Sequence, residues 1–118
     1  MGSNHAAAEW YRSALPLLLL HELSRCSAHG YGLIEALRHL GFETKGATVY
    51  PHLAKLQHDG WVTADWHTPV SGPPRKMLTI TAAGRERLDQ LHDQWGQFRI
   101  LMDTALSATP TSIEGEKA

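Results

Sequence analysis

The most regular pattern of apolar and polar positions in the chain covers residues 46–60. Three apolar side chains recur there at helical spacing and would form one buried stripe, namely Val49, Leu53 and Leu56. Beside that stripe falls a polar set made of Thr48, His52 and Lys55. Proline is tolerated only near a helix start, so Pro51 predicts a helix that begins close to it, with Thr48 as its cap and Gly60 as its end. The polar face would be either solvated, as on an ordinary surface helix, or free to contact a partner.

The segment that follows favours a partner. Residues 61–67 alternate between apolar and polar side chains, as a half-buried strand does, and residues 77–80 predict a second short strand. Between them lie a loop rich in proline and glycine, residues 69–74, and then Arg75 and Lys76. A helix followed at once by a hairpin with a basic tip is the arrangement of a winged helix-turn-helix. The sequence therefore predicts that the helix is laid against DNA.

Two further helices are expected upstream. From Ser13 onward the leucines cover almost the whole circumference of a helix, which should therefore be central. They are Leu15, Leu18, Leu19 and Leu23. Residues 27–30 break this helix, and a second one follows from about Tyr31 to a stop at Gly41. Its inner stripe is expected to consist of Leu33, Ile34, Leu37 and Leu40.

The apolar positions of a last helix, capped by Thr81, step by three and four residues as in a coiled-coil seam. The seam consists of Leu88, Leu91, Trp95, Phe98, Met102 and Ala105. Such a seam needs a second helix, either the first helix of the same chain or the same helix of a second copy. We favour the second copy, because two-fold dimers are the commonest oligomers. Gly96 weakens this helix by about 1 kcal/mol relative to alanine and marks a close helix approach or a bend.

The predicted fold class is mainly α with a small β-hairpin wing (α+β). Its parts are an N-terminal arm or helix over 1–12, a winged helix-turn-helix over 13–81, a dimerisation helix over 82–106 and a disordered tail over 107–118. The arm carries Trp10 and Tyr11, which would pack on their own domain or, in a dimer, on the partner. The tail mixes Thr, Ser and Pro with charges of both signs, a composition typical of disorder.

Charge is distributed unevenly along the chain. The 118 residues suffice for one domain, and a formal net charge of −1 gives no global signal for nucleic acid. Between Arg25 and Arg87, however, eight Lys and Arg stand against five Asp and Glu, while the two ends have three against seven. The basic excess therefore coincides with the predicted DNA-binding segment.

Chemistry other than binding finds little support. A lone cysteine, Cys26, cannot form an internal disulfide, and no signal peptide is recognisable, so a cytoplasmic location is expected. The eight histidines lack the spacing of a metal site, and we expect no metal and no cofactor. Because no nucleophile, base and orienting partner form a motif, an enzyme is not expected either.

Four segments resemble, in order and spacing, the signatures of the PadR family of bacterial transcriptional regulators. They are HGY at 29–31, ATVYPHLAKL at 47–56 with Asp59 and Gly60, GPPRK at 72–76, and LTIT at 78–81 with Gly84 and Arg85. The resemblance runs from about Leu17 to Trp95. It implies a winged helix, a two-fold dimer built largely by the C-terminal helix, and usually repression of a nearby promoter that a small molecule or another signal relieves.

The chain departs from the commoner family pattern in two respects. Aromatic residues are frequent where Met77 and Leu78 stand, and the C-terminal helix is short, as in the smaller subgroup of the family. These departures leave DNA binding intact and the signal open.

DNA contacts are expected from both the helix and the hairpin. The major groove would be met by Lys45, Thr48, His52 and Lys55. Lysine and threonine would mostly hold phosphates and His52 would reach a base edge, whereas Arg75 and Lys76 would grip the backbone or enter the minor groove. A dimer would set two such helices about one duplex turn apart, on an inverted-repeat operator. Direct base contacts look few, so DNA shape would supply part of the specificity.

Tyr50 has two interpretations. Helical geometry points it away from Thr48 and His52, which favours packing on the flank of the domain. The resemblance to the PadR family implies instead that its hydroxyl reaches a phosphate.

The resemblance also implies a ligand site. Regulators of the smaller subgroup can bind planar hydrophobic compounds between two C-terminal helices, with a tryptophan where Trp95 stands, flanked here by Phe98 and Trp10. The alternative is that Trp95 is simply the largest residue of a dimer core, because aromatic residues dominate such interfaces anyway. The interface itself would comprise Leu88, Leu91, Trp95, Phe98 and Met102.

A function of another class fits the same fold, namely a protein-interaction module or anti-regulator without an operator of its own. Binding that salt weakens, and that depends on Lys55 and Arg75, would mark a DNA-binding regulator. Salt-tolerant capture of a protein would mark the alternative. The basic hairpin favours the regulator.

Overall fold

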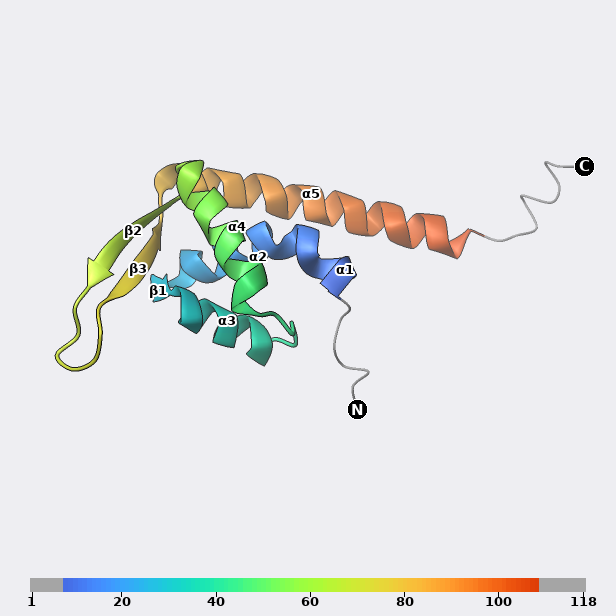
Figure 1. Ribbon diagram of the computed structural model, residues 1–118. Coiled ribbons are helices and arrows are strands. Elements are labelled where there is room, and N and C mark those ends of the chain that lie inside the picture. The colour runs from blue at the N-terminus through green and yellow to red at the C-terminus, as the bar shows by residue number, and fades with distance from the viewer. Residues whose placement is uncertain (1–7, 109–118) are drawn as a thin grey trace, which may run out of the picture. The chain divides into compact units, whose positions relative to one another are not determined.

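The computed structural model describes residues 8–108. Its elements, shown in Figure 1, are α1 (Ala8–Tyr11), η2 (Arg12–Ala14), α2 (Leu15–Arg25), β1 (Ala28–His29), α3 (Gly30–His39), α4 (Gly46–His58), β2 (Val62–His67), β3 (Arg75–Ile80) and α5 (Ala82–Ser107). A first compact unit ends at Leu88, and a second begins at Asp89, so α5 starts in one and continues as the other. The expected tail beyond Ala108 and the first residues of the expected arm, 1–7, lie outside the described residues. None of the described helices is long and apolar enough to cross a membrane.

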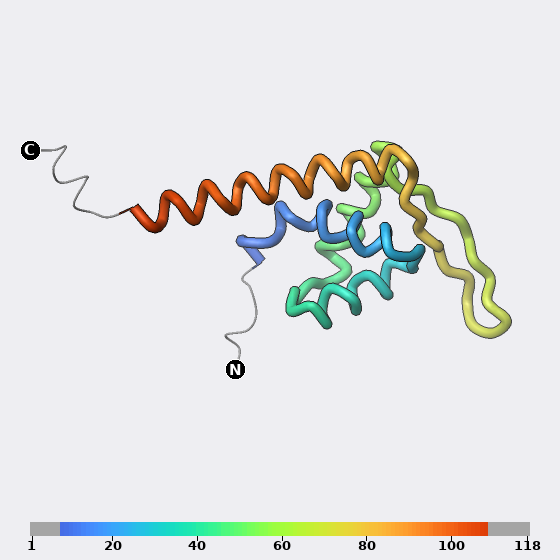
Figure 2. Tube along the Cα trace, turned by 180° about the vertical axis from the view of Figure 1, so that it is seen from behind, coloured from blue at the N-terminus to red at the C-terminus, as the bar shows by residue number. Residues whose placement is uncertain are grey.

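Helix α2 is the centre of the first unit, as its leucine-rich sequence predicts. It contacts α3, α4 and β3, and both views of the chain show it among these elements (Figures 1 and 2). Its buried side chains are Leu15, Leu19, Leu20 and Leu23. Because burying one leucine stabilises a fold by about 1.5–3 kcal/mol, these four side chains hold the helices together.

The start of α2 differs from the sequence expectation. A helix was expected from Ser13, but a 3-10 turn over Arg12–Ala14 precedes α2, which begins at Leu15. Pro16 lies in the first turn of α2, where its missing amide hydrogen has no helical partner to lose. Upstream, Tyr11 packs on its own domain: its ring meets Phe42 edge-on at 5.4 Å, and its hydroxyl donates to the main-chain carbonyl of Glu43.

Helix α3 ends one residue before Leu40, so the expectation that Leu40 belongs to the inner stripe is wrong. Leu40 is 59% exposed, whereas Leu33, Ile34 and Leu37 are buried. The chain reverses at Gly41, whose φ of 106° favours glycine, and the Phe42 amide donates back to the Leu37 carbonyl at 2.9 Å. This closure turns position 40 outward.

Helix α4 begins earlier than expected. The main-chain carbonyl of Lys45 accepts hydrogen bonds from the amides of Thr48 and Val49 at 3.0 and 2.9 Å, so the first turn is already closed at Gly46. Thr48 is therefore not the cap, and Lys45 occupies that position without a side-chain bond. Pro51 lies inside the helix rather than at its start, on the exposed side. The predicted stripe of Val49, Leu53 and Leu56 is buried.

The sheet has one strand more than the sequence suggested. Its order is β1-β3-β2, with all neighbours antiparallel. Residues 27–30 were expected only to break a helix, but two of them form β1. In this strand Ala28 pairs with Leu78 and His29 with Met77 of β3. Strand β3 begins at Arg75, so the basic residues expected at the tip of the hairpin are part of the strand.

Thr81 caps α5, as predicted. Its Oγ1 accepts from the Gly84 amide at 3.0 Å and donates to the Gly60 carbonyl at 2.8 Å, while its own amide donates to the Trp61 carbonyl at 3.0 Å. The helix start therefore lies directly on the turn that leads from α4 into β2. A Cβ added to Gly84 would come within 2.1 Å of the Trp61 carbonyl oxygen and 2.8 Å of Ile80 Cγ1. Only glycine fits this contact.

We predict that Gly84→Ala destabilises the fold. The added methyl group must displace backbone, an overpacking that costs about 2 kcal/mol or more and lowers the melting temperature by roughly 10 °C. Gly32→Ala is the matched control, because nothing lies within 4 Å of a Cβ at Gly32, inside α3. Better helix propensity should then stabilise this variant by about 0.5–1 kcal/mol. Thermal unfolding followed by circular dichroism measures both, and equal melting temperatures for the two variants would contradict the packing at Gly84.

Candidate nucleic-acid interface

The exposed side of α4 differs from the polar set picked out in the sequence. Thr48 and His52 are half-buried and lie at the edge of the packed stripe. The exposed side chains of the helix, apart from Tyr50 and Gln57, are Ala47, Pro51, Ala54, Lys55 and His58. Sequence reasoning missed the small members of this set because it looked for polar groups. A helical wheel of residues 46–58 that counts small side chains opposite the buried stripe would have found them.

Small side chains matter because they let the helix backbone approach a surface closely. A methyl group such as that of Ala47 or Ala54 can also contact the methyl group of thymine in a major groove. Lys55 stands beside them, with its amine 2.9 Å from Asp59 Oδ2 in an exposed i, i+4 pair. Exposed pairs of this kind contribute little to stability, so the lysine can exchange this partner for another anion at small cost.

Tyr50 packs on the flank of the domain, as one of its two interpretations holds. A Cβ added to Gly30 would come within 2.5 Å of Tyr50 Cε1, and one added to Gly46 within 3.0 Å of Cε2. The ring therefore rests against the first residues of both α3 and α4. Tyr50 is still 50% exposed, so its flank position leaves part of the side chain accessible.

A hollow of about 380 Å³ opens beside Tyr50, at the N-terminal end of α4. Residues that line it include Tyr31, Arg38, Glu43, Thr44, Lys45 and Tyr50. No described side chain caps this end of α4, so the positive end of the helix dipole faces the hollow without a protein anion at the cap. Thr44 is buried, and its Oγ1 has no hydrogen-bond partner among the described residues. The exposed Tyr31 was not singled out by the sequence.

The two faces of the hairpin are chemically different. Along β2 and β3 the inner face carries Val62, Ala64, Trp66, Lys76, Leu78 and Ile80, and the outer face Thr63, Asp65, His67, Arg75, Met77 and Thr79. The strand register pairs Trp66 with Lys76 and His67 with Arg75. Trp66 is 69% exposed, and the sequence analysis did not assign it a role.

The outer face is tied to β1 by two histidines. The rings of His29 and His67 stack with centroids 5.4 Å apart, and His29 Nδ1 lies 3.0 Å from the main-chain oxygen of Lys76. These contacts fix the loop-side end of the β2–β3 ladder against β1 and the start of α3. No group of three His, Cys, Asp or Glu that could hold a metal occurs among residues 8–108.

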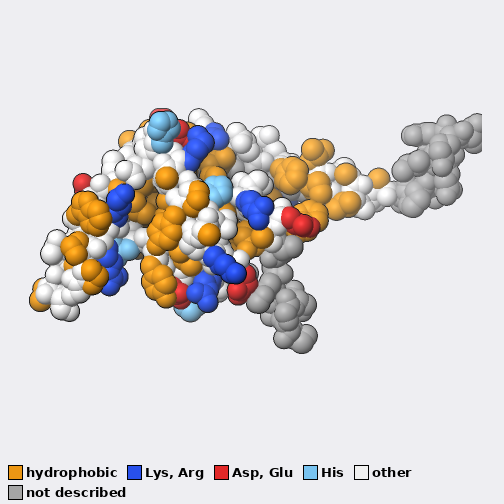
Figure 3. All heavy atoms as spheres, in the orientation of Figure 1, with side chains coloured by type: hydrophobic (Ala, Val, Ile, Leu, Met, Phe, Trp, Pro, Cys, Tyr) orange, Lys and Arg blue, Asp and Glu red, His pale blue; other side chains and the backbone are white. Residues whose placement is uncertain are grey.

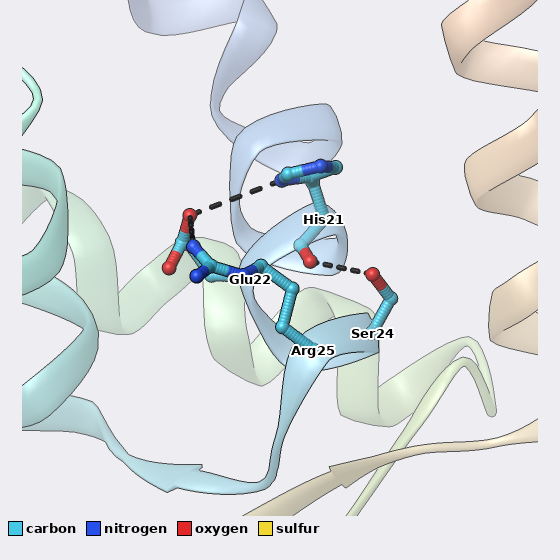
Figure 4. A network of polar contacts seen from close by, with 4 residues as sticks. All are labelled: His21, Glu22, Ser24 and Arg25. Atoms are coloured by element: carbon cyan, nitrogen blue, oxygen red, sulfur yellow. Dashed lines mark hydrogen bonds and ion pairs between the residues drawn. The ribbon is translucent and has the colours of Figure 1, made fainter.

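Ion pairs sort the basic residues into two groups. Arg25 and Arg38 lie 3.7 Å from Glu22 and 3.0 Å from Glu35 on their own helices. Figure 4 shows the first pair, with the half-buried Glu22 carboxylate between the His21 ring and Arg25, and Ser24 bonded to the His21 carbonyl. Lys45, Arg75 and Lys76 form no ion pair with any described residue. Three of the cations picked out in the sequence are therefore free to attract an external anion.

The space-filling view shows how these groups are spread. Lys and Arg side chains recur over the hairpin and over α3 and α4 on the face turned to the viewer, between hydrophobic side chains (Figure 3). Acidic side chains lie among them near α3, in keeping with the local ion pairs. The surface is thus a mixture of cations and apolar groups, as phosphate positioning combined with groove contacts requires.

The second unit consists of the outer part of α5 and carries the expected seam. Trp95 and Phe98 are 46% and 54% exposed, and their ring centroids lie 6.3 Å apart. Further exposed apolar side chains there are Ile100, Leu101 and Leu106. Trp10, which was grouped with Trp95 and Phe98 in the sequence analysis, lies on α1 in the first unit and is 72% exposed.

Comparison with known proteins gives consistent results. A model of the transcriptional regulator PadR-like family matches residues 19–90. The chain is 32% identical to the transcriptional regulator Rv3488 of Mycobacterium tuberculosis (strain ATCC 25618 / H37Rv) over 82 residues, which are 70% of this chain and 76% of that protein.

Solved structures confirm the predicted fold. A PadR family transcriptional regulator from Eggerthella lenta DSM 2243 superposes with a TM-score of 0.79 at 29% identity, over 86% of this chain and 88% of that one. A PadR-like transcriptional regulator from Bacillus cereus strain ATCC 14579 gives a TM-score of 0.76 at 24% identity, over 86% and 99% of the two chains. The second likeness concerns the fold alone.

Proposed function

Because the chain belongs to the PadR-like family of transcriptional regulators, we propose that it is a dimeric repressor that binds an inverted-repeat operator and is released by a small molecule or another signal. The observation that carries this proposal is the surface shared by α4 and the hairpin. It combines Lys45, Arg75 and Lys76, which form no ion pair with residues 8–108, with a helix face of small side chains. No catalytic function is proposed, since the family and the relatives are regulators rather than enzymes.

In this proposal α4 lies in the major groove. Ala47, Pro51 and Ala54 let the helix backbone approach the base edges, and His52 is the side chain suited to hydrogen bond with one of them. Lys55 and Thr48 would hold phosphates at the rims of the groove. The direct base contacts are then few, so sequence-dependent DNA shape contributes to specificity.

The N-terminal end of α4 is suited to a backbone phosphate. Its amides are not capped by a described side chain, and Lys45, Tyr31 and Tyr50 line the same hollow, together with the acidic Glu43. Tyr50 can therefore fill both roles considered for it, packing on the glycines with its ring and reaching a phosphate with its hydroxyl. At the hairpin, Arg75 and Lys76 would hold the backbone on either side of the neighbouring minor groove.

Dimerisation would supply the second half of the site. The exposed apolar residues of α5 form a seam that a second copy can cover, and two winged helices would then read half-sites about 34–36 Å apart. The proposed interface consists of Leu88, Leu91, Trp95, Phe98 and Met102. The signal would act at the same seam, because a planar hydrophobic compound that binds Trp95 and Phe98, with Trp10 from the arm, changes how two copies pack and hence the spacing of their helices.

We predict salt-sensitive binding to the DNA just upstream of the protein's own gene. Fluorescence anisotropy at two salt concentrations, with competitor duplex, should show specific binding that weakens steeply as salt rises. Arg75→Ala should weaken binding to all sequences and reduce the slope of log K against log salt by about one. Arg99→Ala removes another exposed cation, on α5, and should change neither the affinity for DNA nor the salt slope. Salt-tolerant binding to a protein and none to DNA would establish the interaction-module alternative.

The dimer depends on the two aromatic residues of α5. Trp95→Ala combined with Phe98→Ala should raise the dimer dissociation constant at least tenfold in sedimentation equilibrium, because aromatic anchors carry much of the energy of such interfaces. Ile100→Ala is the control: it removes an equally exposed side chain that helical phase places on another side of α5. An unchanged dissociation constant in the double variant would place the interface elsewhere.

An effector at the seam should change tryptophan fluorescence. Titration with planar hydrophobic or cationic dyes is expected to give a saturable change in the wild-type protein that is lost in Trp95→Phe and retained in Trp61→Phe, a tryptophan of the first unit. Saturating dye should also release the DNA. If no dye changes the tryptophan fluorescence, Trp95 has a role in the dimer interface but none in effector binding.

A further inference from the structure

We infer that Trp66 is a minor-groove contact, and that its indole lets the hairpin select A·T pairs beside each half-site. This inference deepens the proposed DNA-binding function and rests on it. It starts from the position of Trp66 at the end of β2, directly across from Lys76 on the neighbouring strand.

The inner face of the sheet extends beyond the core. Its first pair, Val62 with Ile80, is buried, and Leu78 of the next pair is also buried. The third pair, Trp66 with Lys76, lies on the same face by strand alternation but is exposed. The core therefore ends one pair before Trp66, and the largest side chain of the hairpin has no packing role in the fold.

An exposed tryptophan on a hairpin is unfavourable in water and favours association with a partner that covers it. An indole that remains 69% exposed keeps most of its apolar surface in water, and the nearby Val70 is fully exposed as well. Covering these side chains would therefore stabilise a complex without any loss of internal packing.

The charges around Trp66 indicate an anionic partner. The inner face has Lys76 as its cation, without an ion pair among the described residues, and carries no acidic side chain on β2 or β3. The outer face instead mixes Arg75 with Asp65 and two histidines. The tryptophan therefore lies on the face whose one charged side chain is Lys76, and nucleic acid is the partner that takes both a cation and a flat apolar ring.

The hairpin points toward the end of the unit where DNA would lie. Strand β2 starts beside the C-terminal end of α4 and runs away from that end at an angle to the helix, so the hairpin loop and the N-terminal end of α4 both lie below it in the two views (Figures 1 and 2). Helix α4 also packs against β2. With α4 in the major groove, the next surface along the duplex within reach of this loop is a minor groove and its phosphates.

The chemistry of the indole selects among base pairs. The Nε1–H group is a donor only, and A·T pairs present only acceptors in the minor groove, at adenine N3 and thymine O2. A G·C pair places the N2 amino group of guanine there, which is itself a donor and obstructs the ring.

The test compares variants on three versions of the bound upstream duplex, in which the pairs flanking each half-site are A·T, G·C or I·C. Inosine lacks the amino group of guanine, so I·C restores the minor-groove pattern of A·T. Wild-type protein should bind the A·T and I·C duplexes similarly and the G·C duplex about tenfold more weakly. Trp66→Ala should bind all three equally, roughly tenfold more weakly than wild type binds A·T. Trp66→Phe should keep part of the affinity and lose the discrimination.

Salt dependence and a matched control complete the design. Trp66→Ala should leave the slope of log K against log salt unchanged, because an indole releases no counterions, whereas Lys76→Ala should lower that slope by about one. Leu40→Ala removes another large exposed apolar side chain, at the end of α3, and should change neither affinity nor slope. Melting temperatures of all variants should match the wild type, since these side chains are mostly exposed.

Three results would overturn the inference. Wild-type affinity for Trp66→Ala, with normal salt-sensitive binding by the wild type, would show that the function stands and Trp66 has no part in it. A salt slope for Trp66→Ala as low as that of Lys76→Ala would show that the ring only positions the lysine. Equal discrimination against G·C by Trp66→Ala and wild type would remove the minor-groove contact. Absence of DNA binding by the wild type would instead refute the proposed function itself.

Discussion

The fold depends on the burial of one leucine-rich helix. Side chains of α2 at four buried positions contact α3, α4 and β3, so a single core holds both helices of the helix-turn-helix and the middle strand of the sheet. That core also stabilises α4 although the helix contains a proline. Pro51 inside this helix costs about 3 kcal/mol relative to alanine, and the burial of Val49, Leu53 and Leu56 more than offsets it.

The surface that we propose for DNA lies where this core ends. On α4 the buried stripe is followed by half-buried Thr48 and His52, and then by small exposed residues. On the inner face of the sheet, the pair of Ala64 with Leu78 is followed directly by the exposed pair of Trp66 with Lys76. The core therefore fixes the backbone beneath each exposed group while leaving the group itself accessible. Because the backbone is already ordered, binding has to order only the side chains, which is how a small domain can gain specificity from few contacts.

Much of this architecture could be predicted from the sequence, because its strongest signals are periodic. The stripe of α4, the central position of α2, the alternating hairpin and the Thr81 cap all depend on residues close together in the chain. Strand β1 could not be predicted in the same way. It has two residues, and it exists only because Ala28 and His29 meet a strand almost fifty residues later.

The errors in the candidate site have a common physical cause. Thr48 looked like a cap because threonine often is one, but the Lys45 carbonyl had already closed the turn. Leu40 looked inward because the spacing continued, but the closure at Gly41 ended the helix first. The sequence assigned no role to Trp66, because strand alternation predicts the face of the sheet on which a residue lies but not how far the buried core extends along that face. Each depends on a tertiary or turn contact that periodicity does not record.

The contact of Tyr50 with Gly30 and Gly46 has an evolutionary consequence. The ring occupies the space that a side chain at either glycine would need, and the two glycines open the two helices of the helix-turn-helix. The three positions therefore pack as one unit. In an alignment of relatives they should covary. Sequences with an aromatic residue at position 50 should have glycine at position 30, whereas sequences without this ring should accept other residues at both glycine positions.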